Sequence, residues 1–405
     1  MRSVAEHRSV VAGLIRPRPP VPVALAEALG LVLAGDVVAE RALPVFDNSA
    51  MDGYAVRAED VADASPEHPV VLPVAKDIPA GRTDGLTLAP GTAHRIMTGA
   101  PLPAGATAVV PVEDTDGGVY TVAIRGSRPA GAHIRRAGED VAAGTTVLRT
   151  GHVVTPAMLG LASALGLAAL PAIPRQRVLV VSTGSELVEP GTPLKPGQIY
   201  ESNSIMLAAA VREAGAEVIA VATVEDDVAQ FGSLLERHAG DTDLIITSGG
   251  VSAGAYEVVK DAFGRDGDFS SGDGVEFVKV AMQPGMPQGI GRVAGATIIT
   301  LPGNPVSALV SFEVFIRPAL RRAMGLPDPE RPLRTAVLAE SLTSPRGRRQ
   351  FRRAFLDQAT GTVVSHGPPA SHHLRWLASA NGLLDIPEDV VEVSAGTEVQ
   401  VWDLT

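Results

Sequence analysis

Residues 241–256 read DTDLIITSGGVSAGAY, an apolar run that ends in glycines and hydroxyl side chains. The pattern predicts a buried strand over 244–247, a turn over 248–252 and then a helix. Glycines at such a junction leave backbone N–H groups open to a phosphate or another oxyanion. A single turn of this kind is more often an ordinary strand–turn–helix junction. A second one, LPGNP at 301–305, also joins an apolar strand to a helix, and the pair favours a ligand site.

Strands and helices alternate on both sides of this stretch. Apolar runs predict strands at 178–182, 217–224, 244–247 and 297–301. Helical patterns occupy 204–213, 228–239 and 306–324. This alternation predicts a doubly wound α/β fold, with a parallel sheet covered on both faces. Ligands of such folds bind beyond the carboxyl ends of the strands, where both glycine turns and the TGSE sequence at 183–186 lie.

The rest of the chain predicts further regions around this α/β domain. We expect a discontinuous, partly helical N-terminal region, a small β-rich domain of short apolar runs broken by Pro and Gly, and a C-terminal small β-barrel. The expected bounds are 1–43 with 132–171, 44–131, 172–327 for the α/β domain, and 328–405. Within the first region, helices are expected at 4–15, 23–29 and 157–170. The last of these is apolar but too short to cross a bilayer, and it is interpreted as a buried helix.

Composition limits the classes of function. The chain has 405 residues, is 45% hydrophobic and 20% charged, and is therefore a folded protein of several domains. Its formal charge of −11 argues against general nucleic-acid binding. The absence of cysteine excludes disulfides, thiolate nucleophiles and zinc–thiolate sites, so a metal would need oxygen ligands or some of the nine histidines. No export signal or membrane span is apparent, and we expect a cytoplasmic protein.

Acidic residues follow several strands of the predicted sheet, namely Glu186, Asp226, Asp227 and Glu257. Any one of them alone is more often a helix cap or a surface residue. Several carboxylates at the strand ends of one sheet suit Mg²⁺, which proteins hold with one or two carboxylates plus phosphate oxygens. Asp226 and Glu257 flank the Ser-Gly-Gly strand and are the expected metal ligands.

Basic residues are concentrated in a few places. Arginines crowd one short segment, at Arg346, Arg348, Arg349, Arg352 and Arg353. Strand alternation would place part of this cluster on a solvated face. Lys279 lies in a largely apolar strand, where its ammonium group either reaches solvent or meets an anion. No Ser-His-Asp arrangement, dinucleotide fingerprint or P-loop occurs. Together, the glycine turns, the acidic residues and the basic residues predict an enzyme that binds a phosphorylated ligand with Mg²⁺.

A series of motifs spans nearly the whole chain. They are DNSAMDGYAVR (47–57), RIMTGAP (95–101), RRAGED (135–140), STGSEL (182–187), TSGGVSAG (247–254), LPGNPVSA (301–308) and SANGLL (379–384). In type and order they resemble the MoeA family, the molybdopterin molybdenumtransferases, which include the E domain of gephyrin. The resemblance implies the last step of molybdenum cofactor synthesis. In that step adenylylated molybdopterin and molybdate give the metal-loaded cofactor and AMP, with a divalent cation, Mg²⁺.

The resemblance also implies partners and residue roles. It implies an elongated homodimer in which the α/β region of one subunit and the small β region of the other share the active site. Molybdopterin adenylyltransferase would be a further partner. The implied catalytic residues are Asp52, Thr98, Asp140, Glu186, Asp226 and Glu257, with Asp52 and Thr98 reaching in from the partner subunit. The implied ligand-binding residues are Gly249, Gly250, Ser252, Lys279, Pro302, Gly303, Asn304, Ser307, Arg353 and Ser371.

This sequence departs from the family pattern at a few positions. Glu257 stands where aspartate is usual. The family's K-P-G-K-P stretch is here QPGMP (283–287), so Gln283 and Met286 replace lysines usually assigned to molybdate. Losing those cations weakens the binding of a dianion. Either nearby arginines compensate, or the chain handles another oxyanion such as tungstate. A non-catalytic pterin-binding or scaffold protein is a third hypothesis, against which the retained acids argue.

Overall fold

The computed structural model describes residues 1–250, 259, 262 and 274–405, and these form two compact units. Unit 1 comprises Met1–Val21, Gly30–Val32 and Pro171–Thr405, and unit 2 comprises Pro22–Leu29 and Leu33–Leu170. Among the residues described, no helix is long and apolar enough to span a membrane. Ser252 and Glu257 lie outside the described residues.

Unit 1 is built on a six-stranded sheet with the order β16-β13-β17-β21-β20-β18. The strands are β13 (Arg177–Thr183), β16 (Glu217–Val224), β17 (Leu244–Ser248), β18 (Gly274–Lys279), β20 (Pro287–Val293) and β21 (Ala296–Leu301). The first three in the order and β21 are parallel, while β20 and β18 are antiparallel. Because β17 and β21 are buried along their whole length, they are uniformly apolar or hydroxylated. The predicted doubly wound fold is confirmed, with an antiparallel edge added.

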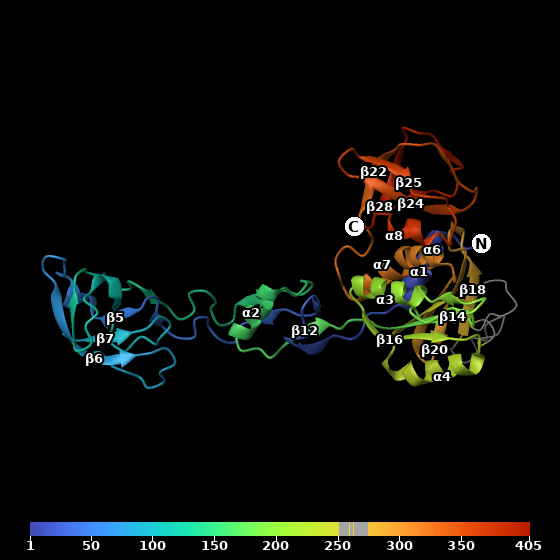
Figure 1. Ribbon diagram of the computed structural model, residues 1–405. Helices are drawn as coiled ribbons and strands as arrows, with labels where there is room; N and C mark the ends of the chain where they lie inside the picture. The colour runs from blue at the N-terminus through green and yellow to red at the C-terminus, as the bar shows by residue number, and fades with distance from the viewer. Residues whose placement is uncertain (251–258, 260–261, 263–273) are drawn as a thin grey trace. The chain divides into compact units, whose positions relative to one another are not determined.

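Helices cover both faces of this sheet. α3 (Asn203–Glu213) and α4 (Val228–His238) lie on opposite faces (Figure 1).

The helix expected at 306–324 is confirmed as one helical run made of α6 (Pro305–Ser311), the π-helical η5 (Phe312–Ile316) and α7 (Arg317–Ala323). α1 (Val4–Leu14) begins with a capping box between Ser3 and Glu6 and packs on this run, with the ring of His7 4.7 Å from that of Phe315. Short elements complete this part, β14 (Leu187–Val188), β15 (Ile199–Tyr200) and η3 (Ala239–Asp241).

The C-terminal residues of unit 1 form the predicted β-barrel. Its strands are β22 (Leu333–Leu338), β24 (Arg349–Asp357), β25 (Thr362–Ser365), β26 (Gly382–Ile386) and β28 (Glu398–Asp403). The sheet closes because β24 pairs with both β25 and β26. β19 (Met282–Gln283) comes from the α/β part of the chain and pairs with β24, which places Gln283 opposite Gln350. β23 (Leu342–Thr343), β27 (Glu392–Val393) and α8 (Leu374–Ala378) are short additions.

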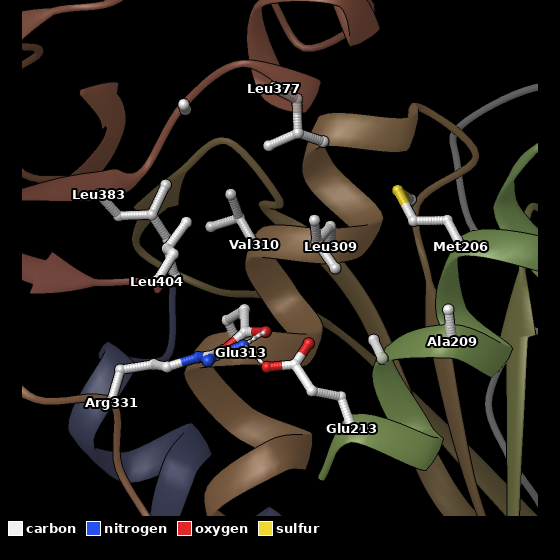
Figure 2. A pocket seen from close by; sticks show the side chains of 12 residues that line it. Met206, Ala209, Glu213, Leu309, Val310, Glu313, Arg331, Leu377, Leu383 and Leu404 are labelled. Carbon is white, nitrogen blue, oxygen red and sulfur yellow. Dashed lines mark hydrogen bonds and ion pairs between the residues drawn. The ribbon is translucent and has the colours of Figure 1, made fainter. Parts of the chain in front are cut away.

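A partly buried ion-pair network joins the linker before the barrel to the α/β helices (Figure 2). The guanidinium of Arg331 contacts Glu313 of η5 at 2.9 Å and Glu213 of α3 at 2.6 Å. Burial alone would lower the pKa of Arg331, but the hydrogen bonds and charges of the two glutamates raise it above its ordinary value. These charges border an apolar cavity of about 270 Å³ between α3, α6 and the barrel, lined by Met206, Leu309, Val310, Leu377 and Leu383 among others.

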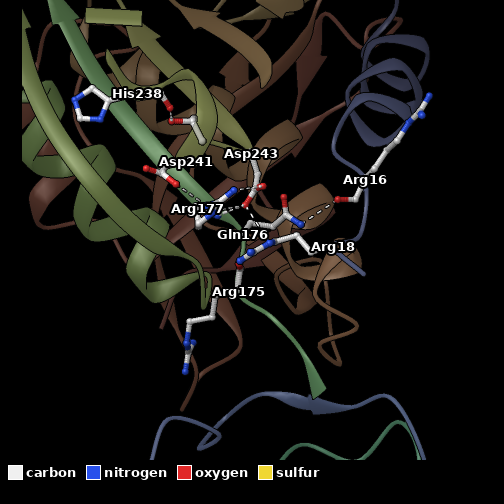
Figure 3. Close-up of polar contacts among 9 residues, drawn as sticks. Arg16, Arg18, Arg175, Gln176, Arg177, His238, Asp241 and Asp243 are labelled. Carbon is white, nitrogen blue, oxygen red and sulfur yellow. Dashed lines mark hydrogen bonds and ion pairs between the residues drawn. The ribbon is translucent and has the colours of Figure 1, made fainter. Parts of the chain in front are cut away.

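A second polar network fixes the beginning of the sheet (Figure 3). Arg177 at the start of β13 contacts Asp243, which precedes β17, through its backbone N–H at 2.8 Å and its side chain at 3.3 Å. The hydrogen bond to Asp243 raises the pKa of Arg177. Arg18 contacts the same carboxylate at 3.5 Å, and Gln176 donates to the carbonyl of Arg16. The segment that leaves α1 is thereby attached to the amino-terminal ends of β13 and β17, opposite the strand ends that carry the glycine turns.

Unit 2 contains a five-stranded sheet with the order β8-β5-β7-β6-β9. These strands are β5 (Gly53–Val56), β6 (Val70–Ile78), β7 (Ala93–Ile96), β8 (Ala108–Pro111) and β9 (Thr121–Ile124), around a core that includes Tyr54, Val110 and Ile124. The remaining short elements are β1 (Val21–Ala24), β2 (Val32–Leu33), β3 (Val37–Val38), β4 (Asn48–Ser49), η1 (Ala58–Val61), η2 (Val112–Asp114), β10 (Ile134–Arg135) and β11 (Thr146–Leu148). The β-rich character expected of residues 44–131 is confirmed.

Two of the expected helices are wrong. Residues 157–170 do not form one buried helix, because α2 (Pro156–Ala164) ends before Gly166, whose φ of +81° terminates it, and β12 (Ala169–Ile173) follows. Only Ala162 of α2 is fully buried. Residues 23–29 are not helical either, since they form the end of β1 and then turns. In both segments the apolar spacing fits a short strand and a turn as well as it fits a helix.

Candidate active site

The two glycine turns lie side by side at the carboxyl ends of β17 and β21. These strands are parallel neighbours in register, with Ser248 opposite Leu301. The N–H of Gly249 donates to the carbonyl of Leu301 at 3.0 Å. Gly249 has φ of +97°, and a methyl group there would lie 2.6 Å from the carbonyl oxygen of Thr183. Glycine is therefore required at this point of closest approach between neighbouring strands.

Asn203, at the start of α3, connects these turns. Its amide N–H₂ group donates to Ser248 Oγ at 2.7 Å and to the carbonyl of Gly303 at 2.6 Å. Glu201 fixes the beginning of α3, because its buried carboxylate accepts from Ser182 Oγ at 2.7 Å and from the N–H of Ser204 at 2.8 Å. Sequence reasoning missed Asn203, since an asparagine at a helix start is explained by capping alone.

Asp226 contacts Ser185, the residue that precedes Glu186. One carboxylate oxygen of Asp226 accepts from the N–H and the hydroxyl of Ser185 at 3.3 and 3.4 Å. Glu186 folds against Gly184, where a methyl group would lie 2.7 Å from Oε2. Both carboxylates are exposed. Within the described part of the chain no group of three or more metal-ligating side chains exists. A pair of carboxylates still fits Mg²⁺, which commonly completes its shell with water and phosphate oxygens.

A cavity of about 430 Å³ lies beside the LPGNP turn, between the α/β domain and the barrel. It brings together Pro302, Gly303, Asn304 and Ser307 from the α/β domain with Ser371 from the barrel. The QPGMP stretch forms another wall, so Gln283 and Met286 also line it. The remaining lining residues are Met282, Pro284, Gly285, Pro287, Arg348, Pro369, Ala370 and His372.

Arg353 and Lys279 are not among the residues that line this cavity. The guanidinium of Arg353 is buried and donates to the carbonyls of Pro368 and His373, the latter at 2.9 Å. Burial lowers the pKa of Arg353. Arg353 thereby holds the ends of the loop whose residues 369–372 face the cavity. Lys279 is exposed on β18, where it pairs with Pro287 of β20.

In unit 2 the structure brings Asp52 and Thr98 into contact. One oxygen of Asp52 accepts from the N–H of Thr98 at 2.6 Å and from its hydroxyl at 2.8 Å. The backbone hydrogen bond, followed by the hydroxyl, lowers the pKa of Asp52. Asp47 similarly binds Arg136 at 2.6 Å. Asp140 is exposed and is held by its backbone N–H, which donates to the carbonyl of Leu43.

Family models match almost the whole chain. Residues 2–166 match the MoeA N-terminal region (domain I and II), and residues 335–404 match the MoeA C-terminal region (domain IV). Residues 179–322 match the model described as "Probable molybdopterin binding domain". The chain belongs to the MoeA family. This confirms the family that the motifs predicted, which acts in molybdenum cofactor biosynthesis.

Individual MoeA relatives agree with this assignment. The chain is 76% identical to molybdopterin molybdenumtransferase 2 of Mycobacterium tuberculosis (strain ATCC 25618 / H37Rv), over 100% of both chains. It is 38% identical to molybdopterin molybdenumtransferase 1 of the same strain, over 99% of this chain and 98% of that protein. A crystal structure of the molybdopterin biosynthesis MoeA protein from Pyrococcus horikoshii matches with a TM-score of 0.74 and 30% identity, covering 100% of this chain and 99% of that one.

Proposed function

We propose that this MoeA-family enzyme inserts molybdenum from molybdate into adenylylated molybdopterin and releases AMP. The observation that carries the proposal is the position of Gly303. It lines the cavity on one side, and on the other its carbonyl binds Asn203, which also binds Ser248 in the Ser-Gly-Gly turn. An oxyanion in the cavity would therefore lie beside backbone groups that suit the phosphate of the pterin substrate.

The residues of unit 1 fit the chemistry that this reaction requires. Substrate and products carry several phosphate charges. Because the N–H of Gly249 already donates to Leu301, the backbone N–H of Gly250 is the donor of this turn that we assign to a phosphate. Asp226, with Glu257, would hold Mg²⁺, which when bound neutralises charge on the phosphate oxygens as the phosphoanhydride breaks. Glu186 follows Ser185, which binds Asp226, and would orient groups at the same site.

We also propose a homodimer with a shared active site. Asp52 and Thr98 lie in unit 2, whereas Glu186 and Asp226 lie in unit 1. In the proposed dimer the partner's unit 2 would supply Asp52 and Thr98. Unit 1 offers an apolar surface for such contact, since Ile205 and Val221 are 56% and 45% exposed at the rim of a cavity of about 470 Å³.

The proposed substrate implies a supplier and a compartment. A phosphoanhydride between molybdopterin and AMP must be made by an adenylylating enzyme, so we propose molybdopterin adenylyltransferase as the partner that delivers it. We place both in the cytoplasm. The net charge of −11 makes nucleic acid an unsuitable partner.

AMP release tests the proposed function. The purified chain is incubated with adenylylated molybdopterin and Mg²⁺, together with molybdate, tungstate or neither. We expect release to depend on molybdate. Release that depends only on tungstate would support the second candidate, a paralogue for another oxyanion, which Gln283 and Met286 favour. No release under any condition would leave the non-catalytic scaffold as the surviving hypothesis.

A further inference from the structure

We propose that the hydroxyl of Thr183 donates a hydrogen bond to the substrate phosphate that the N–H of Gly250 binds. The proposal rests on the proposed function, because that function supplies the phosphorylated substrate. Thr183 is the last residue of β13, and its side chain takes no part in the contacts described so far. The phosphate site would thus gain a neutral donor from a strand of the sheet, beside the turn that carries Gly250.

The hydroxyl of Thr183 is buried and unpartnered. Thr183 is 6% exposed, and its Oγ1 atom has no hydrogen-bond partner among the residues that the structure describes. A buried hydroxyl without a partner has lost its bonds to water and gained none in return, which costs free energy. Such groups are rare in native proteins, and an exception requires an explanation such as a functional role. Packing within the described part of the chain does not supply one.

Two neighbouring hydroxyls at the same end of the sheet do have partners. Ser182 donates to Glu201 at 2.7 Å, and Ser248 accepts from Asn203 at 2.7 Å. Both bonds are made on the α3 side of the sheet, where Glu201 and Asn203 lie at the start of that helix. Because side chains alternate along a strand, Thr183 faces the other side of the sheet. The polar contacts that satisfy its neighbours therefore do not reach it.

The Thr183 hydroxyl lies against the Ser-Gly-Gly turn. A Cβ atom placed on Gly249 would lie 2.8 Å from Thr183 Oγ1, and one placed on Gly250 would lie 3.3 Å from it. Glycine at both positions therefore keeps side-chain atoms of the turn away from this hydroxyl. The N–H of Gly250 belongs to the same turn, so one phosphate can accept from both donors.

A phosphate would change the energetic role of this hydroxyl. Hydrogen bonds to an ionised acceptor are stronger than those between neutral groups, and phosphate is such an acceptor. The free energy lost when the hydroxyl is buried would thus be recovered only when the substrate binds. Thr183 is therefore expected to weaken the free protein and strengthen its complex, which is the reverse of what a packing residue does.

Thr247 and Thr300 provide matched controls for Thr183. They lie opposite each other on β17 and β21, are fully buried, and have hydroxyls without a partner among the described residues. Strand alternation places all three threonines on the side of the sheet that packs against α4. The residue opposite Thr247 on β13 is Val181, so Thr183 lies two residues nearer to the turn. The controls share its chemistry and burial but not its position at the turn.

Binding of adenylylated molybdopterin without molybdate, measured by equilibrium dialysis on the full-length chain, tests the proposal. Thr183→Val replaces the hydroxyl with a methyl group and should raise the dissociation constant about 10-fold or more, the loss expected for a hydrogen bond to a charged group. Its Tm should stay the same or rise, because an unpartnered buried hydroxyl is removed. Thr247→Val and Thr300→Val should change Tm in the same direction and leave the dissociation constant within about twofold.

The conservative variant Thr183→Ser separates a binding role from a structural one. It keeps the hydroxyl and removes a buried methyl group, so its Tm should fall while its affinity stays close to that of the wild type. A structural role predicts instead that affinity follows stability in both variants. Inorganic phosphate, added as a competitor, reports on the phosphate contact alone. Its inhibition constant should rise in Thr183→Val by a factor similar to that for the substrate.

The outcomes distinguish this inference from the proposed function. Wild-type affinity in Thr183→Val, an equal loss in either control, or an equal loss in Thr183→Ser would overturn the role of Thr183. Unchanged competition by phosphate in Thr183→Val would overturn it as well, and AMP release by the wild type would still support the proposed function. Substrate binding that depends on Thr183, without AMP release when molybdate is present, would remove the proposed function and leave the phosphate contact intact. No measurable binding by the wild type would overturn both.

Discussion

Asp226 and Asp227 are adjacent, exposed and equally charged, yet they bind different parts of the structure. Asp226 contacts Ser185 beyond β13, whereas Asp227 accepts from the N–H groups of Ala229 and Gln230 and so caps α4. Asp226→Ala should abolish AMP release at little cost in stability, because the exposed carboxylate proposed to hold the metal makes only two long hydrogen bonds, to Ser185 at 3.3 and 3.4 Å. Asp227→Ala should keep the activity and lower the free energy of unfolding by about 1 kcal/mol, as lost caps do. An active Asp226→Ala enzyme would remove the metal assignment.

The hydrogen bonds that Thr98 donates lower the pKa of the Asp52 carboxylate. Its pKa is lowered, so its contribution to folding is present above the ordinary value of about 3.9 and is lost as the pH falls through the lowered value. Thr98→Val deletes the hydroxyl but keeps the backbone bond, and should raise the pKa of Asp52 part of the way. Carbon-13 NMR titration of the carboxyl group measures this. Thr150→Val is the control, because the N–H and hydroxyl of Thr150 bind Asp36 as those of Thr98 bind Asp52. It should leave the pKa of Asp52 unchanged.

At the residue scale, sequence alone predicted the glycine turns and several acids but not which side chains face each other. Asn203 looks like a helix cap, and its bonds to Ser248 and Gly303 become visible only when the start of α3 is placed beside the ends of β17 and β21. In the sequence, Arg348 and Arg353 are two arginines of the same basic segment, and nothing local distinguishes them. Their separation into a cavity-lining side chain and a buried loop anchor depends on barrel closure, which local pattern does not encode.

At the scale of elements, Asn203 attaches α3 to the turns after β17 and β21. Asn203→Ala removes two hydrogen bonds, so it should cost about 1–3 kcal/mol of unfolding free energy and raise the KM for adenylylated molybdopterin. Asn381→Ala is the matched control, because Asn381 also makes two bonds, both to Leu356 in the barrel. It should lower stability similarly and leave that KM unchanged. Equal effects of both variants on KM would reduce Asn203 to a purely structural role.

The Arg331 network makes a prediction about the attachment of the barrel linker to the helices. Arg331→Met leaves the carboxylate of Glu313, which is 5% exposed, without its close partner and should cost about 3–5 kcal/mol in chemical denaturation. Combining it with Glu313→Leu should restore most of this loss. Glu213 is 57% exposed, so Glu213→Gln should cost less than about 1 kcal/mol. A costly Glu213→Gln, or a harmless Arg331→Met, would contradict this ranking.

Element prediction succeeded where the apolar pattern was long and failed where it was short. The parallel strands and the helical run at 305–323 follow from sustained apolar runs and a helical period. The π-helical turn at Phe312–Ile316 and the antiparallel edge of the sheet left no such signal. At 157–170 a glycine in the left-handed region divided one apolar run into a helix and a strand.

At the scale of the whole molecule, the distribution of acids over two units allows a test of the shared active site. If Asp52 of one chain works with Asp226 of another, a mixture of Asp52→Ala and Asp226→Ala chains forms hybrid dimers with one complete site. After mixing and reassociation, AMP release should recover to about a quarter of the wild-type rate. Each variant alone should be inactive. No recovery in a mixture shown to exchange subunits would place both acids in one chain's own site.

The β-barrel carries Arg348, whereas Gln283 and Met286 belong to the polypeptide before it. Both segments are therefore needed to form the cavity beside the LPGNP turn. A fragment that ends before β22 would also leave β19 without β24, its partner strand in the barrel. Truncation at the linker would thus remove one wall of the cavity and leave an unpaired strand edge on the remaining part.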